Sequence, residues 1–209
     1  MENDSVNEKF EKYKLLINAR NFHYDNFNKW MTYYYVAIGA LFVGYYTLMS
    51  GNKIDDFGEY SLMILGLIVS LFWYWSCKGY YYWNINFILL VNNYEKEILE
   101  FKEKERVYFV FANKKTQNNY LSPISGANIS TSKVTILFAF TISVMWGILL
   151  VFKVFEQIDC LKDCNWLRIL ISLSASILTV ITLSTLIPKR FLKSKIDHFP
   201  DLQIDQDKK

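Results

Sequence analysis

Four long apolar blocks restrict the fold of this chain more than any other feature. They cover residues 31–49, 61–77, 134–152 and 167–187, so each has 17 to 21 residues. A transmembrane helix needs about 20 apolar residues to cross about 30 Å of hydrocarbon. The blocks contain no Asp, Glu or Lys, and Arg168 near the start of the last block is their only Arg. We therefore predict an all-α membrane protein with four transmembrane helices rather than a soluble helical bundle.

The positive charges lie mainly on one side of these predicted spans. Of the 23 Lys and Arg residues, 19 fall in residues 1–30, 78–133 and 188–209, and four fall on the opposite side. Cytoplasmic segments of membrane proteins carry an excess of Lys and Arg. We therefore expect a cytoplasmic amphipathic helix in the first segment, a cytoplasmic helical extension and loop in the second, and a cytoplasmic basic tail in the third.

The second apolar block continues into a polar segment without an obvious helix break. Apolar side chains alternate four and three residues apart from Trp73 to Phe101, as they do in a coiled-coil seam. The same alternation runs from Val6 to Leu48. We therefore expect cytoplasmic helical extensions of spans one and two, with each seam buried on the other extension or on a neighbouring subunit. The first extension is either continuous with its span or bends near Trp30.

Two polar residues, Arg20 and Asn84, interrupt these seams. In coiled coils such residues lower stability but fix the register and the number of associating helices. We interpret them as residues that specify pairing, with Arg20 contacting Glu95 or Glu97 of the other extension. A solvent-exposed Arg20 is the alternative. The residues expected to drive oligomerisation are Arg20, Asn84, Phe87, Val91, Tyr94 and Ile98.

The segment after residue 105 is polar and contains Pro and Gly. The run from Val107 to Phe111 is short and rich in residues that favour strands, so it predicts one short strand, and the remainder predicts a loop. Connections of this length are commonly functional. The segment is a candidate for binding a cytoplasmic partner.

Hydroxyl side chains form a stripe on the fourth predicted span. Ser172, Ser176 and Thr179 fall three or four residues apart and share one helix face. Such a face either packs on a neighbouring helix or lines a narrow wet path through the membrane. Packing is the commoner reason, because Ser and Thr hydroxyls can bond the backbone carbonyl one turn back. Both interpretations stay open.

Two cysteines, Cys160 and Cys164, lie in the connection between spans three and four. That connection is expected outside the cytoplasm, where an oxidising environment permits a disulfide. Four-residue spacing on a helical turn brings two cysteines within bridging distance. A disulfide and two free thiols are therefore both open, whereas Cys77 lies on the cytoplasmic side and is expected to stay reduced.

The chain offers few of the groups that catalysis or metal binding requires. Its two histidines, His23 and His198, have no partner at metal-ligand spacing, and we find no Gly-rich phosphate loop or nucleophile motif. No acid lies inside a predicted span to carry protons. We therefore expect no enzymatic activity, no cofactor, no metal and no nucleic-acid partner.

A basic cluster follows the last span at Pro188. It consists of Lys189, Arg190, Lys193 and Lys195. Such a cluster is attracted to an anionic inner leaflet by about 1 kcal/mol per charge. We expect a contact with anionic lipid here, and the alternative is a simple topological stop signal.

The residues after the second span resemble a motif of the RipA-like octameric membrane proteins, which are small bacterial proteins. In that family an Asn is followed by apolar residues and an acid at fixed intervals. The motif is formed here by Trp83, Asn84, Ile88, Val91, Tyr94 and Glu95. The helix before span one, with Arg20 and the run from Asn21 to Trp30, is similar too. Phe87 stands where the family usually has a Lys, and the resemblance covers mainly the first half of the chain.

The resemblance implies a homo-oligomeric ring, with eight as its expected number of subunits, and no established enzymatic activity. We therefore predict a multi-pass protein of the bacterial inner membrane, with both termini in the cytoplasm, that assembles through its cytoplasmic seams. The assembly is expected to form a pore or a membrane effector. The alternative is a non-conducting scaffold that recruits a cytoplasmic partner through residues 107–133.

Overall fold

The computed structural model describes residues 2–51, 54–108, 119–124, 126–156 and 165–193. Helices dominate these residues and no strand occurs among them, which confirms the prediction of an all-helical chain. The α-helices are α1 (Glu2–Ser50), α2 (Asp56–Asn93), α3 (Thr131–Glu156) and α4 (Asn165–Ile187). Short turns accompany them, among them the π-helical turns η1 (Tyr94–Ile98) and η5 (Pro188–Leu192), and the 3-10 turn η2 (Glu103–Glu105).

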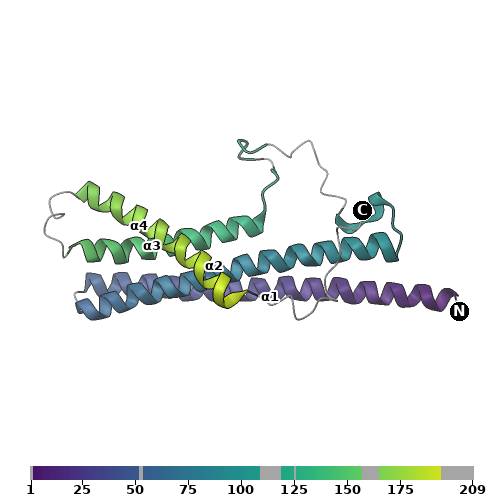
Figure 1. Cartoon of the computed structure of the whole chain (residues 1–209), viewed down its shortest axis with the longest axis horizontal. Helices are drawn as coiled ribbons and strands as arrows, with labels where there is room; N and C mark the ends of the chain where they lie inside the picture. Colours follow the sequence, from purple (N-terminus) through teal and green to yellow (C-terminus); the bar gives the residue numbers. More distant parts are fainter. Residues whose placement is uncertain (1, 52–53, 109–118, 125, 157–164, 194–209) are drawn as a thin grey trace.

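The two longest helices, α1 and α2, run side by side in opposite directions (Figure 1). The 49 residues of α1 form one helix, so the amphipathic extension and the first apolar block are continuous and no break occurs at Trp30. At 1.5 Å per residue this helix is about 74 Å long, more than twice the thickness of the hydrocarbon core. Asp55 caps the start of α2, where its carboxylate accepts the backbone N–H of Gly58 at 2.9 Å.

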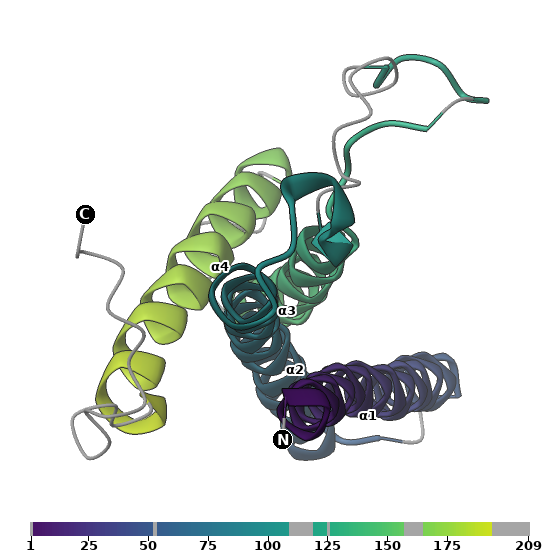
Figure 2. The same ribbon diagram turned by 90° about the vertical axis from the view of Figure 1, so that its right-hand side faces the viewer.

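The shorter helices α3 and α4 cover only the apolar halves of this pair. Viewed from the end, α2 lies between α1 and α3, and α4 crosses obliquely on the other side (Figure 2). Three hydrophobic clusters hold this half together. Their buried residues are Met31, Ile38, Trp73, Cys77 and Ala139; Tyr45, Met63 and Trp146; and Leu71, Val144 and Val180. The central helix α2 contributes to all three clusters.

Two glycines allow the helices of this half to approach closely. A Cβ atom built on Gly66 of α2 would lie 2.3 Å from the indole of Trp146 on α3. A Cβ atom on Gly147 of α3 would lie 3.1 Å from the Cβ of Ser176 on α4. Small residues at such crossings are typical of helix packing in membranes.

Three helical segments are long and apolar enough to cross a membrane. They are Asp56–Ile98, Thr131–Glu156 and Asn165–Leu192. The chain is therefore a multi-pass membrane protein by length and composition, with α1 outside this set. The apolar block of α1 contains five tyrosines among its 19 residues, and their hydroxyls lower its hydropathy.

The predicted strand after residue 105 is wrong for the residues that the structure describes. Val107 and Tyr108 form a 3-10 turn, and residues 109–111 lie outside the described part of the chain. A lone strand would have no neighbour to satisfy its backbone groups. The N–H of Val107 instead donates to a side chain of η1, the carboxylate of Glu95.

Candidate functional site

The charged halves of α1 and α2 are residues 2–30 and 78–93. They lie side by side beyond the region that α3 and α4 cover (Figure 1). Aromatic rings from both helices fill the space between them. The ring centroids of Tyr13 and Tyr94 are 6.2 Å apart, and Phe27 stacks on Tyr80 with a centroid separation of 3.5 Å. The two seams therefore face each other within one protomer.

The residues expected to drive oligomerisation do not all have the same surroundings. Val91 is fully buried, and Phe87 and Tyr94 contact side chains or backbone of α1. Asn84 is partly buried, and Ile98 is 40% exposed. Phe87, Val91 and Tyr94 thus help to join α1 to α2 of the same protomer, and a role between subunits stays a prediction for the set.

His23, rather than Tyr24, faces α2 in the seam. The four-and-three alternation that begins at Val6 includes Tyr24, yet the side chain of Tyr24 is 45% exposed. The centroid of His23 lies 5.0 Å from that of Tyr80 and 5.2 Å from that of Phe87. The shift is local, because Phe27 and Met31, the next positions of the alternation, again face inward. Burial lowers the pKa of His23, and a backbone hydrogen bond with Tyr80 partly opposes this, so the contact favours the neutral imidazole.

Glu95 is fully buried where the two helices meet the turn η2. Its Oε1 accepts the hydroxyl of Tyr13 on α1 at 2.5 Å and the backbone N–H of Val107 at 3.2 Å. Its Oε2 is buried without a hydrogen-bond partner. One carboxylate thus connects α1, the end of α2 and the segment that leads into the long loop.

The π-helical turn η1 explains why the alternation of apolar residues did not place Glu95 in the seam. The four-and-three alternation places Tyr94 in the seam and Glu95 outside it. A π turn adds one residue to a helical turn and so changes which side chains point inward. Here it directs both Tyr94 and Glu95 toward α1. No residue in the sequence marks this insertion.

Arg20 does not pair with either of the acids expected for it, Glu95 or Glu97. Its guanidinium carbon lies 5.8 Å from the ring of Tyr24 and 6.0 Å from the ring of Tyr108. Glu97 instead forms an exposed ion pair with the neighbouring Lys96. The expected pairing is therefore wrong in this protomer, because aromatic faces surround the cation and Glu95 turns toward Tyr13.

Several buried polar atoms around this contact have no hydrogen-bond partner in the described residues. They are Arg20 Nε, His23 Nε2, Tyr80 Oη and Glu95 Oε2. Buried polar groups are usually paired with protein atoms or with ordered water. We refer to these four residues with Tyr13 as the polar cluster.

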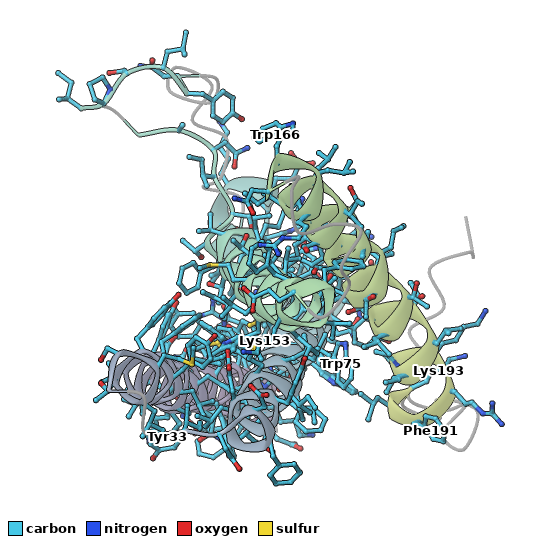
Figure 3. All side chains as sticks on the ribbon, turned by 90° about the vertical axis from the view of Figure 1, so that its left-hand side faces the viewer. Tyr33, Trp75, Lys153, Trp166, Phe191 and Lys193 are labelled. Carbon is cyan, nitrogen blue, oxygen red and sulfur yellow. The ribbon has the colours of Figure 1, made fainter. Side chains whose placement is uncertain are left out.

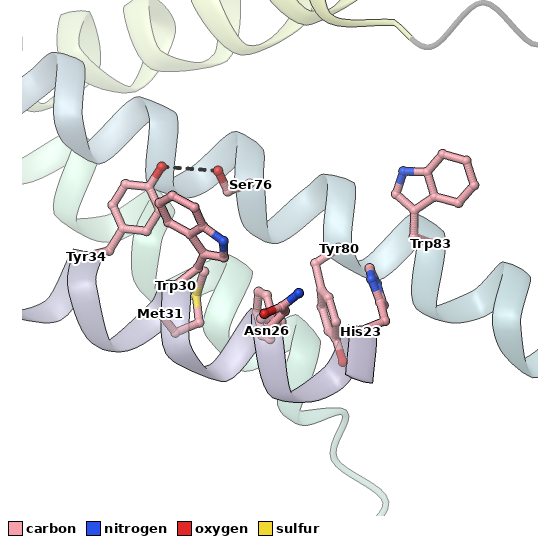
Figure 4. A pocket seen from close by; sticks show the side chains of 9 residues that line it. His23, Asn26, Trp30, Met31, Tyr34, Ser76, Tyr80 and Trp83 are labelled. Atoms are coloured by element: carbon pink, nitrogen blue, oxygen red, sulfur yellow. Dashed lines mark hydrogen bonds between the residues drawn. The ribbon is translucent and has the colours of Figure 1, made fainter. Parts of the chain in front are cut away.

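A groove opens between α1 and α2 next to this cluster. Its volume is about 440 Å³, and the side chains around it are largely aromatic (Figure 4). It is lined by His23, Asn26, Phe27, Trp30, Met31, Tyr34, Ser76, Tyr80 and Trp83. Trp30 and Trp83 are 60% and 46% exposed, and the hydroxyls of Tyr34 and Ser76 lie 3.3 Å apart. We call this feature the aromatic groove.

An ion pair ties α2 to α3 at the opposite end of the molecule. Lys153, labelled in Figure 3, lies 2.8 Å from Oε2 of Glu59, whose side chain is only 6% exposed. Tyr45 of α1 donates its hydroxyl to the other oxygen of Glu59 at 3.2 Å. Asp56 lies 3.5 Å from the same ammonium group but is 78% exposed.

We expect Glu59→Ala to destabilise the folded protein by about 1 to 2 kcal/mol. Removing one partner of a buried pair leaves the other charge uncompensated, and the partial exposure of Lys153 reduces the cost. The Tyr45 hydroxyl also loses its acceptor. Asp56→Ala is the matched control and should change stability by about 0.5 kcal/mol or less. Thermal unfolding in detergent, followed by circular dichroism, measures both; equal losses would contradict the assignment.

The hydroxyl stripe of α4 is split between two environments. Ser172 and Ser176 are fully buried, and Ser176 lies against Gly147 of α3. The hydroxyl of Ser176 donates to the carbonyl of Ser172 at 2.6 Å. Thr179 is exposed in the protomer. The two serines therefore occupy a helix-packing position, and Thr179 does not share it.

Cys160 and Cys164 lie outside the described residues, so their predicted disulfide stays open. Cys77 is a free thiol buried between α1 and α2, where its Sγ lies 3.5 Å from the sulfur of Met31.

Part of the basic tail can be described. Lys189 and Arg190 are exposed in η5, and Lys193 follows this turn (Figure 3). Their contact with anionic lipid stays a prediction.

Together these features define a helical, multi-pass membrane protein whose described residues contain no cluster of His, Cys, Asp or Glu suited to a metal ion. The chain belongs to the octameric membrane protein family (8xMP), whose model matches residues 10–155. The match covers most of α1, all of α2 and nearly all of α3. It confirms the resemblance and supports a homo-oligomeric membrane protein. Comparison with curated proteins and with solved structures gave no match.

Proposed function

We propose that this chain is a bacterial inner-membrane protein that crosses the bilayer four times and acts by assembling with copies of itself. Both termini and the charged halves of α1 and α2 lie in the cytoplasm. The uneven distribution of Lys and Arg supports this orientation. The apolar half of α1 is the fourth span. Its packing supports this, because Met31 and Ile38 share one hydrophobic cluster with Trp73 and Ala139.

The observation that carries this proposal is the exposure of large apolar side chains on the charged halves of α1 and α2. Leu15 and Phe22 are both 67% exposed, and Trp83 and Leu89 are 46% and 39% exposed. Hydrocarbon does not cover these positions if they lie in the cytoplasm, and exposed apolar patches mark interaction surfaces. Family membership supports another copy of the chain as the partner. The subunit contacts then fall on the outer faces of the α1 and α2 pair.

The sharper form of the proposal makes this assembly a pore or a membrane-perturbing effector that acts without catalysis. Ser172 and Ser176 pack against α3, whereas Thr179 is exposed. A wet path would therefore run between protomers, past Thr179, rather than between α3 and α4 of one protomer. Hydroxyls suit such a path because they bond water and can also satisfy themselves on the backbone.

The mass and the conductance of the purified protein test this proposal together. In mild detergent we expect one species of eight subunits by native mass spectrometry, and in a planar bilayer we expect it to conduct. Thr179→Trp should reduce the conductance several-fold, while Leu178→Trp, at the neighbouring exposed position, should change it little. A protein that stays a single protomer at every concentration would contradict the assembly, and equal effects of the two variants would contradict the path.

A non-conducting scaffold is the second candidate. It is favoured by the exposure of Tyr120, Leu121 and Ile124, which are 60%, 98% and 94% exposed in the described part of residues 107–133. Glu95 also fixes the start of this segment through the N–H of Val107. An oligomer of the expected mass that does not conduct would favour this candidate over the pore.

A further inference from the structure

The helices α1 and α2 run on beyond the region that α3 and α4 cover (Figure 1), and the side chains that line the aromatic groove come from both of them (Figure 4). Its cytoplasmic end is formed by His23, Asn26 and Trp83. Trp83 lies six positions beyond residue 77, the end of the second apolar block, so this end lies about 9 Å past the span at 1.5 Å per residue. Acyl chains do not reach that depth in the proposed orientation.

The lining of the groove favours a protein as its occupant. None of its nine side chains is an acid, Lys or Arg, so it has no cation to attract a lipid phosphate. Two of its residues, Trp30 and Trp83, remain 60% and 46% exposed. Tryptophan is enriched among the residues that contribute most to protein association, particularly where a partner removes it from water.

We propose that the aromatic groove receives α1 of a second copy of this chain, with Phe22 as the side chain that enters it. This inference rests on the self-assembly proposed above and assigns its contact surface. Phe22 is 67% exposed, as is Leu15 one heptad earlier, and both lie on the side of α1 that faces away from α2. Together they form an apolar ridge that is largely exposed in the protomer.

The position of Phe22 along α1 fits this contact. It precedes His23 by one residue, so in a ring of parallel subunits it stands level with the cytoplasmic end of the neighbouring groove. The groove and the ridge are different surfaces of one protomer, and a contact between different surfaces repeats around a ring until the ring closes. The octameric family to which the chain belongs is consistent with such closure.

Trp83→Glu and Tyr82→Glu test the groove with a matched pair of variants. The two residues are adjacent on α2 and 46% and 48% exposed, yet only Trp83 lines the groove. We expect Trp83→Glu to increase the fraction of free protomer at least tenfold in native mass spectrometry, because a carboxylate would be buried in the contact. Tyr82→Glu should leave the mass distribution unchanged. Circular dichroism of both full-length variants checks that each protomer is folded.

A photo-crosslinking amino acid in place of Phe22 identifies the occupant directly. In cells we expect an adduct of two chains whose second crosslinked peptide contains residues 76–83. An adduct to lipid, or to another part of a second copy, would overturn the groove contact while leaving self-assembly intact. If the wild-type protein is a single protomer in native mass spectrometry, the self-assembly on which this contact rests is itself contradicted.

Discussion

Gly66→Ala is expected to destabilise the folded protein by about 3 kcal/mol, which is the upper end of the usual cost of overpacking a core. The new methyl carbon would lie 2.3 Å from the indole of Trp146. This indole is fully buried, with aromatic rings packed against it. It stacks on Phe42 with a centroid separation of 4.5 Å and meets the ring of Tyr45 edge-on at 5.9 Å. The collision therefore separates α2 from α3 or displaces α1.

Gly79→Ala provides the matched control, because it makes the same substitution in the same helix. A Cβ atom on Gly79 would meet nothing within 4 Å, so we expect this variant to be neutral or slightly stabilising. Thermal unfolding in detergent compares the two variants. Trp146→Phe in the Gly66→Ala protein should recover part of the loss by removing indole atoms. Equal unfolding temperatures for the two alanine variants would contradict the close approach.

The membrane helices could be predicted from sequence because a charge in hydrocarbon is costly, so a long block without charged residues indicates such a helix. The blocks ending at residues 152 and 187 agree with α3 and α4 to within a few residues. The continuity of α1 was left open, although no Pro occurs before Pro123 to interrupt it. The close approach of α2 to α3 was not predictable. Nothing around Gly66 or Trp146 shows that these two residues, 80 positions apart, come together.

The polar cluster shows a second limit of sequence patterns. The alternation of apolar residues identified the helix faces that meet, including Tyr13 and Val91. It could not predict the one-residue shift of η1, because a π turn depends on how the whole helix end packs. The expected pairing of Arg20 with an acid failed for a related reason. It assumed regular helix to residue 97, whereas the turn brings Tyr108 to Arg20 and Glu95 to Tyr13.

Glu95→Ala is expected to open the charged end of the α1 and α2 pair while leaving the half that α3 and α4 cover folded. The variant removes the acceptor of both the Tyr13 hydroxyl and the Val107 N–H. Leaving a buried donor unsatisfied costs about 1 to 3 kcal/mol. Amide hydrogen exchange in residues 6–20 and 99–107 should therefore accelerate about 10-fold to 100-fold, with α3 unchanged. Glu97→Ala, two residues along the same turn, should have little effect, because the ion pair of Glu97 with Lys96 is exposed.

Tyr13→Phe separates the two hydrogen bonds of Glu95 in a double-mutant cycle. Burial and the hydrogen bond to Glu95 raise the pKa of the Tyr13 hydroxyl, which keeps it protonated as a donor at neutral pH. Alone, Tyr13→Phe should accelerate exchange in residues 6–20 but less in residues 99–107, because the bond from Val107 survives. In the Glu95→Ala protein the same change should cause no further loss and should recover part of it, because it removes the buried donor that Glu95→Ala leaves unsatisfied. Additive effects would mean that Glu95 and Tyr13 act separately, and that the carboxylate does not join α1 to the loop.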